Sequence, residues 1–144
     1  MANTRRDQEY LGIDTNVLVA YLDHEHPQHD KVRKLSTRKI ALNPTIIHEA
    51  YHTLVFKMKW DQEEASQVLK EVATDESTLF VNQSLKSAIA GLELAVEYPL
   101  GGRDALIIAN FIVGGIRDLR TFDGSLLEIR EIKYGKRRIS IRPP

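Results

Sequence analysis

Short apolar runs alternate with amphipathic stretches along the chain. Short runs of about five residues that contain apolar or β-branched side chains predict strands at 9–13, 39–43, 78–82, 118–122 and 137–141. Between them, apolar residues recur every three or four positions and predict helices at 15–23, 27–36, 44–59, 61–73, 83–98 and 103–115. Strands that alternate with helices favour a parallel sheet covered on both faces. We therefore predict an α/β fold with a central sheet of about five strands, the last of them at an edge.

Capping residues mark several helix boundaries. Asn43 precedes Pro44 at the expected start of one helix, and Asp61 with Glu64 forms a capping-box-like pair at the start of the next. The helix after Pro44 carries an apolar stripe: Ile47, Tyr51, Leu54 and Met58. The helix at 103–115 is apolar almost all round, so we expect it to be buried.

The bulk composition is that of one ordinary globular domain. The chain has 144 residues, of which 42% are hydrophobic and 28% charged, and it contains no cysteine. Disulfides and thiolate metal sites are therefore excluded. No stretch approaches the ~20 apolar residues that span a bilayer, and the first ten residues lack the apolar region of a signal peptide. We expect a single domain over residues 1–144, located in the cytoplasm.

The formal net charge is +0, but the basic residues are unevenly spread. Residues 31–39 contain no acid, and neither does the C-terminal segment 133–144. Five basic residues lie in that last segment: Lys133, Lys136, Arg137, Arg138 and Arg142. Such runs are either solvated surface or contact surfaces for phosphates, and charge alone does not distinguish the two.

Four acidic residues stand at junctions between the expected elements: Asp14, Glu49, Asp104 and Asp123. Asp14 interrupts the apolar run LGIDTNVL at the end of the first strand, and Asp123 follows the fourth strand. Glu49 lies on the third helix, and Asp104 lies in the first turn of the apolar helix. Each position also has a simpler structural explanation, as a helix cap, a turn, a dipole contact or a solvated side chain.

Taken together, these four acids predict a metal site. Ligands of parallel sheets bind beyond the carboxyl ends of the strands, and all four acids can converge there. Four converging carboxylates repel one another unless a cation holds them. Oxygen ligands without cysteine suit Mg²⁺ or Mn²⁺, and such an ion supports the hydrolysis of phosphodiester bonds.

Four ordered segments resemble the PIN-domain nucleases, and most of all the VapC-type toxins of toxin–antitoxin pairs: IDTNVLVAYL, PTIIHEAYHTLV, GGRDALIIAN and LRTFDGSLL. The resemblance implies a three-layer α/β/α sandwich and a Mg²⁺- or Mn²⁺-dependent endoribonuclease. Its catalytic and metal-binding residues would be Asp14, Glu49, Asp104 and Asp123. Asn16 and Thr121 match the supporting polar positions. The implied partners are an RNA substrate, an antitoxin protein and a second copy of the chain.

The basic segment 133–144 does not belong to the family pattern, so its role stays open. Four basic residues are candidates for contact with RNA: Arg103, Lys136, Arg137 and Arg138.

A competing motif lies on the third helix. Residues 48–52 read HEAYH, an H-E-x-x-H pattern that places His48 and His52 on one helix face for Zn²⁺, with Glu49 as general base of a peptidase. The extended pattern with a third histidine is absent, although Glu71 is available as a third ligand. This alternative leaves the three aspartates unexplained. A third hypothesis is a non-catalytic RNA-binding domain, which the presence of all four acids disfavours.

The loop at 23–30, DHEHPQHD, holds three further histidines and is interpreted as a polar loop.

A hollow lined by four carboxylates is expected to attract a basic side chain as well as a metal ion. We predict a partner that lays an amphipathic segment across the hollow and inserts an Arg or Lys. Val17, Leu18 and Tyr21 are candidates for its groove if they lie outside the core.

Overall fold

The computed structural model describes residues 10–144, and its centre is a six-stranded sheet in the order β3-β2-β1-β4-β6-β5. The strands are β1 (Tyr10–Ile13), β2 (Lys39–Leu42), β3 (Thr78–Phe80), β4 (Asp118–Arg120), β5 (Glu131–Tyr134) and β6 (Arg137–Arg142). All neighbouring strands pair in parallel except β5 and β6. Residue 9, the predicted start of the first strand, and the N-terminal stretch 1–9 lie outside the described residues.

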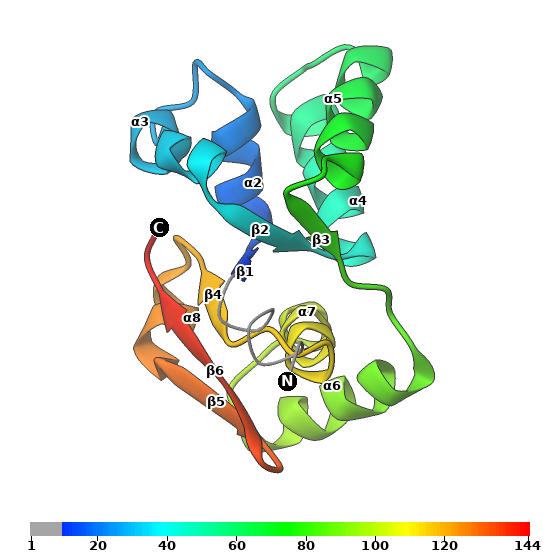
Figure 1. The fold of residues 1–144 in the computed structure, drawn as a ribbon, viewed down its shortest axis with the longest axis vertical. Coiled ribbons are helices and arrows are strands. Elements are labelled where there is room, and N and C mark those ends of the chain that lie inside the picture. Colours follow the sequence, from blue (N-terminus) through cyan, green and yellow to red (C-terminus); the bar gives the residue numbers. More distant parts are fainter. Residues whose placement is uncertain (1–9) are drawn as a thin grey trace.

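Helices connect the strands and flank the sheet. They are α2 (Thr15–Leu22), α3 (His29–Val32), the 3₁₀ helix η1 (Arg33–Thr37), α4 (Pro44–His52), the π-helix η2 (Thr53–Lys57), α5 (Gln62–Thr74), α6 (Leu85–Glu97), α7 (Gly102–Val113) and α8 (Gly124–Ile129). Figure 1 shows α2 to α5 in the upper half of the view and α6 with α7 in the lower half, with the sheet between them. The predicted α/β/α sandwich is confirmed.

The C-terminal part of the sheet differs from the prediction. Residues 137–142 do not form an edge strand, because β6 lies between β4 and β5. The edge is β5, which the sequence pattern did not reveal. Tyr134 pairs with Arg137 across a two-residue turn, and Gly135 occupies the left-handed region there with φ 61°. Most of the basic segment 133–144 is therefore paired strand rather than a free tail.

The helix expected at 44–59 is interrupted. Regular α-helix ends at His52 and continues as one π-helical turn, and Lys59 then adopts φ 62°. The residues that this segment buries completely are Ile46, Ala50 and Leu54. Of the predicted stripe, only Leu54 belongs to this set, and its other members are half-buried. The stripe was displaced because the apolar arc of this helix is wide, and the neighbouring helices α2, α5 and α7 cover only part of it.

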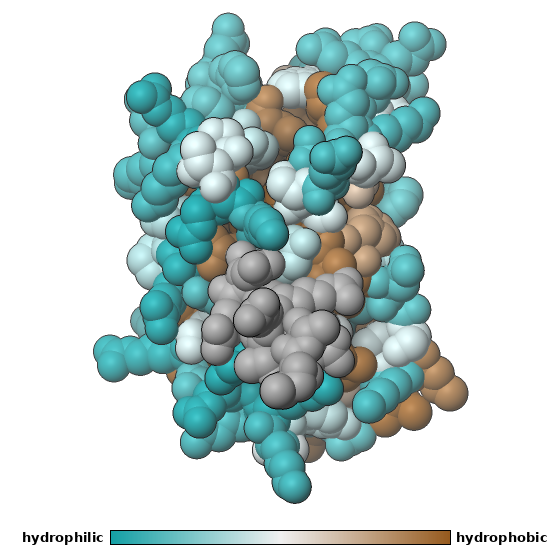
Figure 2. All heavy atoms as spheres, in the orientation of Figure 1, coloured by the Kyte–Doolittle hydropathy of each residue, from teal (hydrophilic) through white to brown (hydrophobic). Residues whose placement is uncertain are grey.

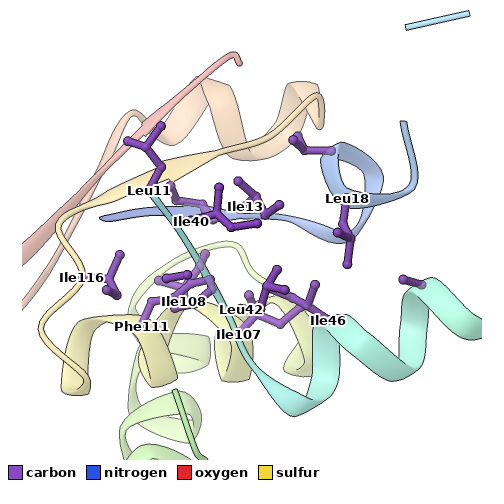
Figure 3. Close-up of a cluster of buried hydrophobic side chains, with 14 of the residues drawn as sticks. Leu11, Ile13, Leu18, Ile40, Leu42, Ile46, Ile107, Ile108, Phe111 and Ile116 are labelled. Carbon is purple, nitrogen blue, oxygen red and sulfur yellow. The ribbon is translucent and has the colours of Figure 1, made fainter. Parts of the chain in front are cut away.

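The core is formed where α7 packs against the central strands. Figure 3 shows Ile107, Ile108 and Phe111 of α7 on one side of the central strands, whereas the Leu11 side chain points to the other side. A Cβ atom at Gly12 would lie 3.1 Å from the Phe111 ring, so glycine permits this close approach of α7 to β1. As predicted, α7 is buried on most of its surface.

The burial of residues on α2 and the lengths of the helices bear on the predicted partner groove and on the membrane prediction. Val17 and Leu18 are completely buried, so they do not line a partner groove. Tyr21 is half-buried and lines a different cavity from the one described below. Within residues 10–144, no helix has the length and apolar character needed to cross a membrane.

Candidate active site

The carboxyl ends of β1 and β4 bring distant polar residues together. Ile13 pairs with Arg120, and the Asp14 N–H donates to the Arg120 carbonyl at 2.9 Å, so Asp14 and Thr121 leave the sheet side by side. A cavity of about 780 Å³ opens beyond this point. Its lining includes all four candidate acids: Asp14, Glu49, Asp104 and Asp123. The structure therefore brings together the residues that the sequence singled out.

Asp14 is the most deeply placed of these acids, with only 7% of its surface exposed. Its Oδ1 accepts from the Thr15 N–H at 2.8 Å, and its Oδ2 accepts from the Thr121 hydroxyl at 2.8 Å. Burial raises the pKa of Asp14 from 3.8 to about 6, more than the two hydrogen bonds lower it. The negative charges of Asp104 and Glu49 raise it further. The protein thus holds a carboxylate whose charge it does not fully compensate.

Thr121 and Asn16, the predicted supporting residues, connect the two strand ends. The completely buried Thr121 hydroxyl donates to Asp14 and accepts from the Asp123 N–H at 3.0 Å. Asn16 accepts from the Phe122 N–H through its Oδ1 at 3.2 Å. These bonds hold the loop after β4 against the start of α2, so the orientation of Asp14 and the path of the chain at Asp123 are fixed together.

Glu49 reaches the cavity from α4 and is held by two groups. The Thr15 hydroxyl donates to its Oε1 at 2.8 Å, and the Arg103 Nε lies 2.8 Å from its Oε2. The Arg103 side chain is 74% exposed, whereas that of Glu49 is 22% exposed. An exposed guanidinium therefore occupies one oxygen of the acid at the cavity wall, where it also partly neutralises the cluster.

Asp104 and Asp123 differ in how far they are stabilised. The pKa of Asp104 is raised, first by burial and then by the charges of Asp123 and Glu49. Within residues 10–144, the Asp104 carboxylate makes no hydrogen bond or ion pair, although Arg103 lowers its pKa through its charge. Asp123 caps α8: its Oδ1 accepts from the Ser125 hydroxyl at 2.6 Å and from the Ser125 N–H at 2.9 Å. The Ser125 hydroxyl bond is the largest cause of the lowered pKa of Asp123.

The donor set fits a hard divalent cation by its chemistry. It consists of carboxylate oxygens, and two of the acids have pKa values raised by burial and by like charge, which a cation would relieve. As they are arranged, no three or more His, Cys, Asp or Glu side chains of the described part are grouped so that they could hold a metal ion. In this arrangement Glu49 pairs with Arg103, and Asp123 accepts a hydrogen bond from the Ser125 hydroxyl.

The other predicted contact residues divide between two ends of the sheet. Arg103 lines the carboxylate cavity. Lys136, Arg137 and Arg138 instead line a separate hollow of about 270 Å³ at the C-terminal end of α7. The Arg137 guanidinium donates to the Ile112 and Val113 carbonyls at 3.1 and 3.0 Å, which caps that helix. Contact of these three residues with RNA stays a prediction.

The zinc-type pattern does not assemble a site. His48 and Glu49 line different cavities, and Glu71, the available third ligand, lines yet another. The His52 ring lies 5.0 Å from the exposed Phe56 ring. Both histidines are exposed, and Glu49 pairs with Arg103 instead. The histidines at 23–30 likewise form local contacts, such as that between the His29 Nδ1 and the Ala20 carbonyl oxygen at 2.8 Å.

Sequence reasoning missed several residues that line this cavity or support it, among them Thr15, Ser125 and Lys57. Thr15 holds Glu49, Ser125 holds Asp123, and Lys57 brings a second positive charge to the lining. Thr15 and Ser125 lie one and two residues after acids that the sequence did single out, so proximity in sequence was the available signal. Lys57 lies on the π-helical turn, where regular helical spacing from Glu49 does not apply.

Comparisons with known proteins identify the family of the chain and solved structures with a similar fold. The PIN domain family model matches residues 12–132. Among curated proteins, none matches the chain. The crystal structure of Mycobacterium tuberculosis VapC20, described as a sarcin–ricin loop cleaving toxin, is 16% identical, covering 83% of this chain and 94% of that one, with a TM-score of 0.69. VapBC2 from Rickettsia felis, bound to a promoter DNA fragment, is 15% identical, and the match covers 94% of this chain and 98% of that one with a TM-score of 0.67. DNA-bound VapBC from Salmonella typhimurium is 14% identical, and the match covers 93% of this chain and 97% of that one with a TM-score of 0.62.

Proposed function

The chain belongs to the PIN domain family, and on that premise we propose that it is a divalent-metal-dependent endoribonuclease that hydrolyses phosphodiester bonds in RNA. One observation carries the proposal: a buried carboxylate with a pKa of about 6 faces a cavity that three further acids line. A protein that only needed to fold gains nothing from this cluster, because each additional charge raises the free energy of the others. A cation that binds together with the substrate would offset the repulsion among these carboxylates.

The four acids would hold Mg²⁺ or Mn²⁺ at the end of the sheet. When bound, the ion would supply positive charge that stabilises the charge developing on the phosphoryl group. Thr121 keeps Asp14 oriented toward the cavity through their hydrogen bond. Arg103 and Lys57, which share the cavity lining, attract the phosphates of the substrate. Arg103, which pairs with one oxygen of Glu49, would compete with the ion for the charge of this acid.

We further propose that the protein is the toxin of a toxin–antitoxin pair and acts in the cytoplasm. The structures it is similar to include VapC20, described as a toxin, and two VapBC complexes with DNA. The partner would be an antitoxin protein that reaches the carboxylate cavity. A basic side chain suits this role, because Arg103 already shows that a guanidinium can pair with Glu49 at this wall.

Cleavage assays with matched variants test the proposal. Purified full-length protein is incubated with structured and unstructured RNA in EDTA, Mg²⁺ or Mn²⁺. We expect cleavage only with metal, and we expect Asp104→Asn to lower the rate at least about 100-fold, the order lost when one electrostatic contact to a transition state is removed. The control is Asp30→Asn, because the Asp30 side chain is 90% exposed and lies outside the cavity.

The same assays identify the alternatives. Full activity of Asp104→Asn contradicts the four-acid site. RNA binding without cleavage under any metal condition supports a non-catalytic RNA-binding domain instead. Circular dichroism of each variant shows whether a loss of activity reflects unfolding.

A further inference from the structure

The segment 23–30, which joins α2 to α3, brings one of its three histidines to the cavity that the four acids line. Figure 1 shows this segment at the upper end of α2, and Figure 2 shows mostly hydrophilic side chains along the outer edge of that corner of the molecule. His24 is exposed and lines a different cavity, where its ring centroid lies 4.7 Å from that of His29. His26 is half-buried and lines the carboxylate cavity together with Pro27 and Gln28. The structure thus separates His26 from the two other histidines of the segment.

Hydrogen bonds fix the position of this segment and the proton of His26. The His29 Nδ1 donates to the Ala20 carbonyl at 2.8 Å, which ties the start of α3 to α2, and the His26 N–H donates to the Asp23 carbonyl at 3.0 Å. The Gln28 N–H donates to the His26 Nδ1 at 3.0 Å. A ring nitrogen that accepts this bond carries no proton, so the proton of the neutral imidazole is on Nε2. No hydrogen bond within residues 10–144 engages this Nε2–H group, which is therefore available to a ligand.

The cavity continues beyond the acids along α2 and the end of the helix that carries Glu49. We call this second part of the lining the outer zone: Val19, His26, Pro27, Gln28, Lys57 and Met58. The part of α2 from Asn16 to Leu22 rises about 9 Å at 1.5 Å per residue, and the segment with His26 follows it. A ligand that contacts both the acids and His26 must therefore extend along α2.

The chemistry of the outer zone suits a nucleobase better than a phosphate. Pro27 and Met58 offer apolar surface, which favours the removal of a base from water. The Nε2–H of His26 is a neutral donor, and it matches the acceptor nitrogens and oxygens on the edges of bases. A phosphate is attracted by cations instead, and the same cavity supplies these as Lys57 and Arg103. The lining therefore divides into a cationic part for phosphates and an uncharged part for a base.

We propose that His26 binds the base of a nucleotide next to the scissile phosphate and donates through Nε2–H to an acceptor on the edge of that base. Pro27 and Met58 pack against the same base. The proposal rests on the endoribonuclease activity proposed above and makes His26 a residue that selects the nucleotide. It does not transfer a proton, because loss of the Nε2 proton while Nδ1 is unprotonated would leave an imidazolate anion.

Two substitutions separate the contact with a base from the structure of the segment. In His26→Asn, the shorter amide can accept from the Gln28 N–H in place of Nδ1, but nothing remains at the position of Nε2. In His26→Gln, the amide nitrogen can reach that position and donate. His24→Asn is the matched control, because His24 belongs to the same segment but lines a different cavity. Circular dichroism shows whether each variant is folded.

Cleavage of RNA with and without the base tests the contact. The bond that the wild type cleaves is mapped in a single-stranded RNA, and kcat/KM is measured on this RNA and on versions that lack the base of either flanking nucleotide. We expect His26→Asn to lower kcat/KM about tenfold on the intact RNA, as for the loss of one hydrogen bond, and to have no effect when the contacted base is absent. His26→Gln should recover part of this loss, and His24→Asn should match the wild type. An equal loss on the intact RNA and on both abasic RNAs, or no loss on the intact RNA, overturns the proposal.

Binding of mononucleotides separates this test from that of the nuclease activity. The His26 ring protons are followed by NMR while the wild type in Mg²⁺ is titrated with the common nucleoside 5′-monophosphates or with ribose 5-phosphate, which has no base. We expect at least one nucleotide to shift these protons, and ribose 5-phosphate to leave them unchanged. If this base-dependent shift occurs but the wild type cleaves no RNA, the proposed nuclease activity fails and the base contact stands. Equal shifts with ribose 5-phosphate and the nucleotides, or no shift with any of them, contradict the base contact.

Discussion

The metal-free protein should lose stability as the pH rises through the range in which Asp14 ionises. Burial raises the folded-state pKa of Asp14 from 3.8 to about 6, so between these values the folded state binds more protons than the unfolded chain. The free energy of unfolding therefore falls with increasing pH over this interval. The interval corresponds to about 3 kcal/mol, because one pKa unit is worth about 1.4 kcal/mol. The contribution is fully present below the unfolded pKa and is lost above the folded one.

Urea unfolding of the wild type and Asp14→Asn in EDTA, from about pH 4 to about pH 7, isolates this contribution from all other titrating groups. The amide stays neutral, so it avoids the cost of ionisation while still accepting a hydrogen bond from Thr15 or Thr121. Relative to the wild type, the variant should gain about 3 kcal/mol across the range. Profiles that stay parallel within about 1 kcal/mol would refute the claim that Asp14 carries an uncompensated buried charge.

Asp123 provides a control of opposite sign. Its pKa is lowered, with the Ser125 hydroxyl as the first cause, so its ionised form stabilises the folded state. That stabilisation is present above the unfolded pKa and is lost as the pH falls through the folded value. The difference profile of Asp123→Asn should therefore change in the opposite direction and at lower pH. Adding Mn²⁺ at neutral pH should stabilise the wild type more than Asp14→Asn, because the ion binds only the folded cluster.

The remaining predictions concern catalysis, control and packing. Replacing His48 and His52 together with Gln should leave most RNA cleavage intact, whereas Glu49→Gln should abolish it; stoichiometric zinc that is lost with the histidines would favour the peptidase alternative. Arg103→Ala removes a cation that competes for Glu49, so half-maximal cleavage should need about two- to fivefold less metal, and an unchanged requirement would mean that the pair does not restrict binding. A partner that displaces the metal must bind more weakly as the concentration of Mg²⁺ or Mn²⁺ rises, and calorimetric titration of the partner measures this affinity. If the affinity does not change with metal concentration although the partner still inhibits cleavage, the partner inhibits without displacing the metal. Gly91→Val should cost about 1–3 kcal/mol in thermal unfolding, because its side chain meets the backbone of α7, and a neutral effect would show that the two helices can separate.

Most of the secondary structure could be predicted from the sequence, because the signals involved are local. The predicted caps are present: the side chain of Asn43 accepts from the Ile46 N–H, and that of Asp61 accepts from the Glu64 N–H. Both bonds span three residues, so spacing along the chain suffices to predict them. Asp14 could also be singled out from the sequence alone. It lies inside an apolar run, where burying a carboxylate costs free energy unless a positive group compensates its charge.

Features that depend on contacts between distant segments could be seen only in the folded protein. The edge position of β5 follows from a pairing order that local periodicity does not encode. The Thr121–Asp14 bond joins residues 107 positions apart, and the Thr15–Glu49 bond joins residues 34 apart. The contact of Arg103 with Glu49 depends on two helices meeting at the cavity wall. Periodicity shows that α6 has apolar residues but not which of its faces packs on α7. The exposed apolar residues Leu85, Ile89, Leu92 and Val96 could be identified only in the structure, since burial is a property of the packed molecule and not of the helix alone.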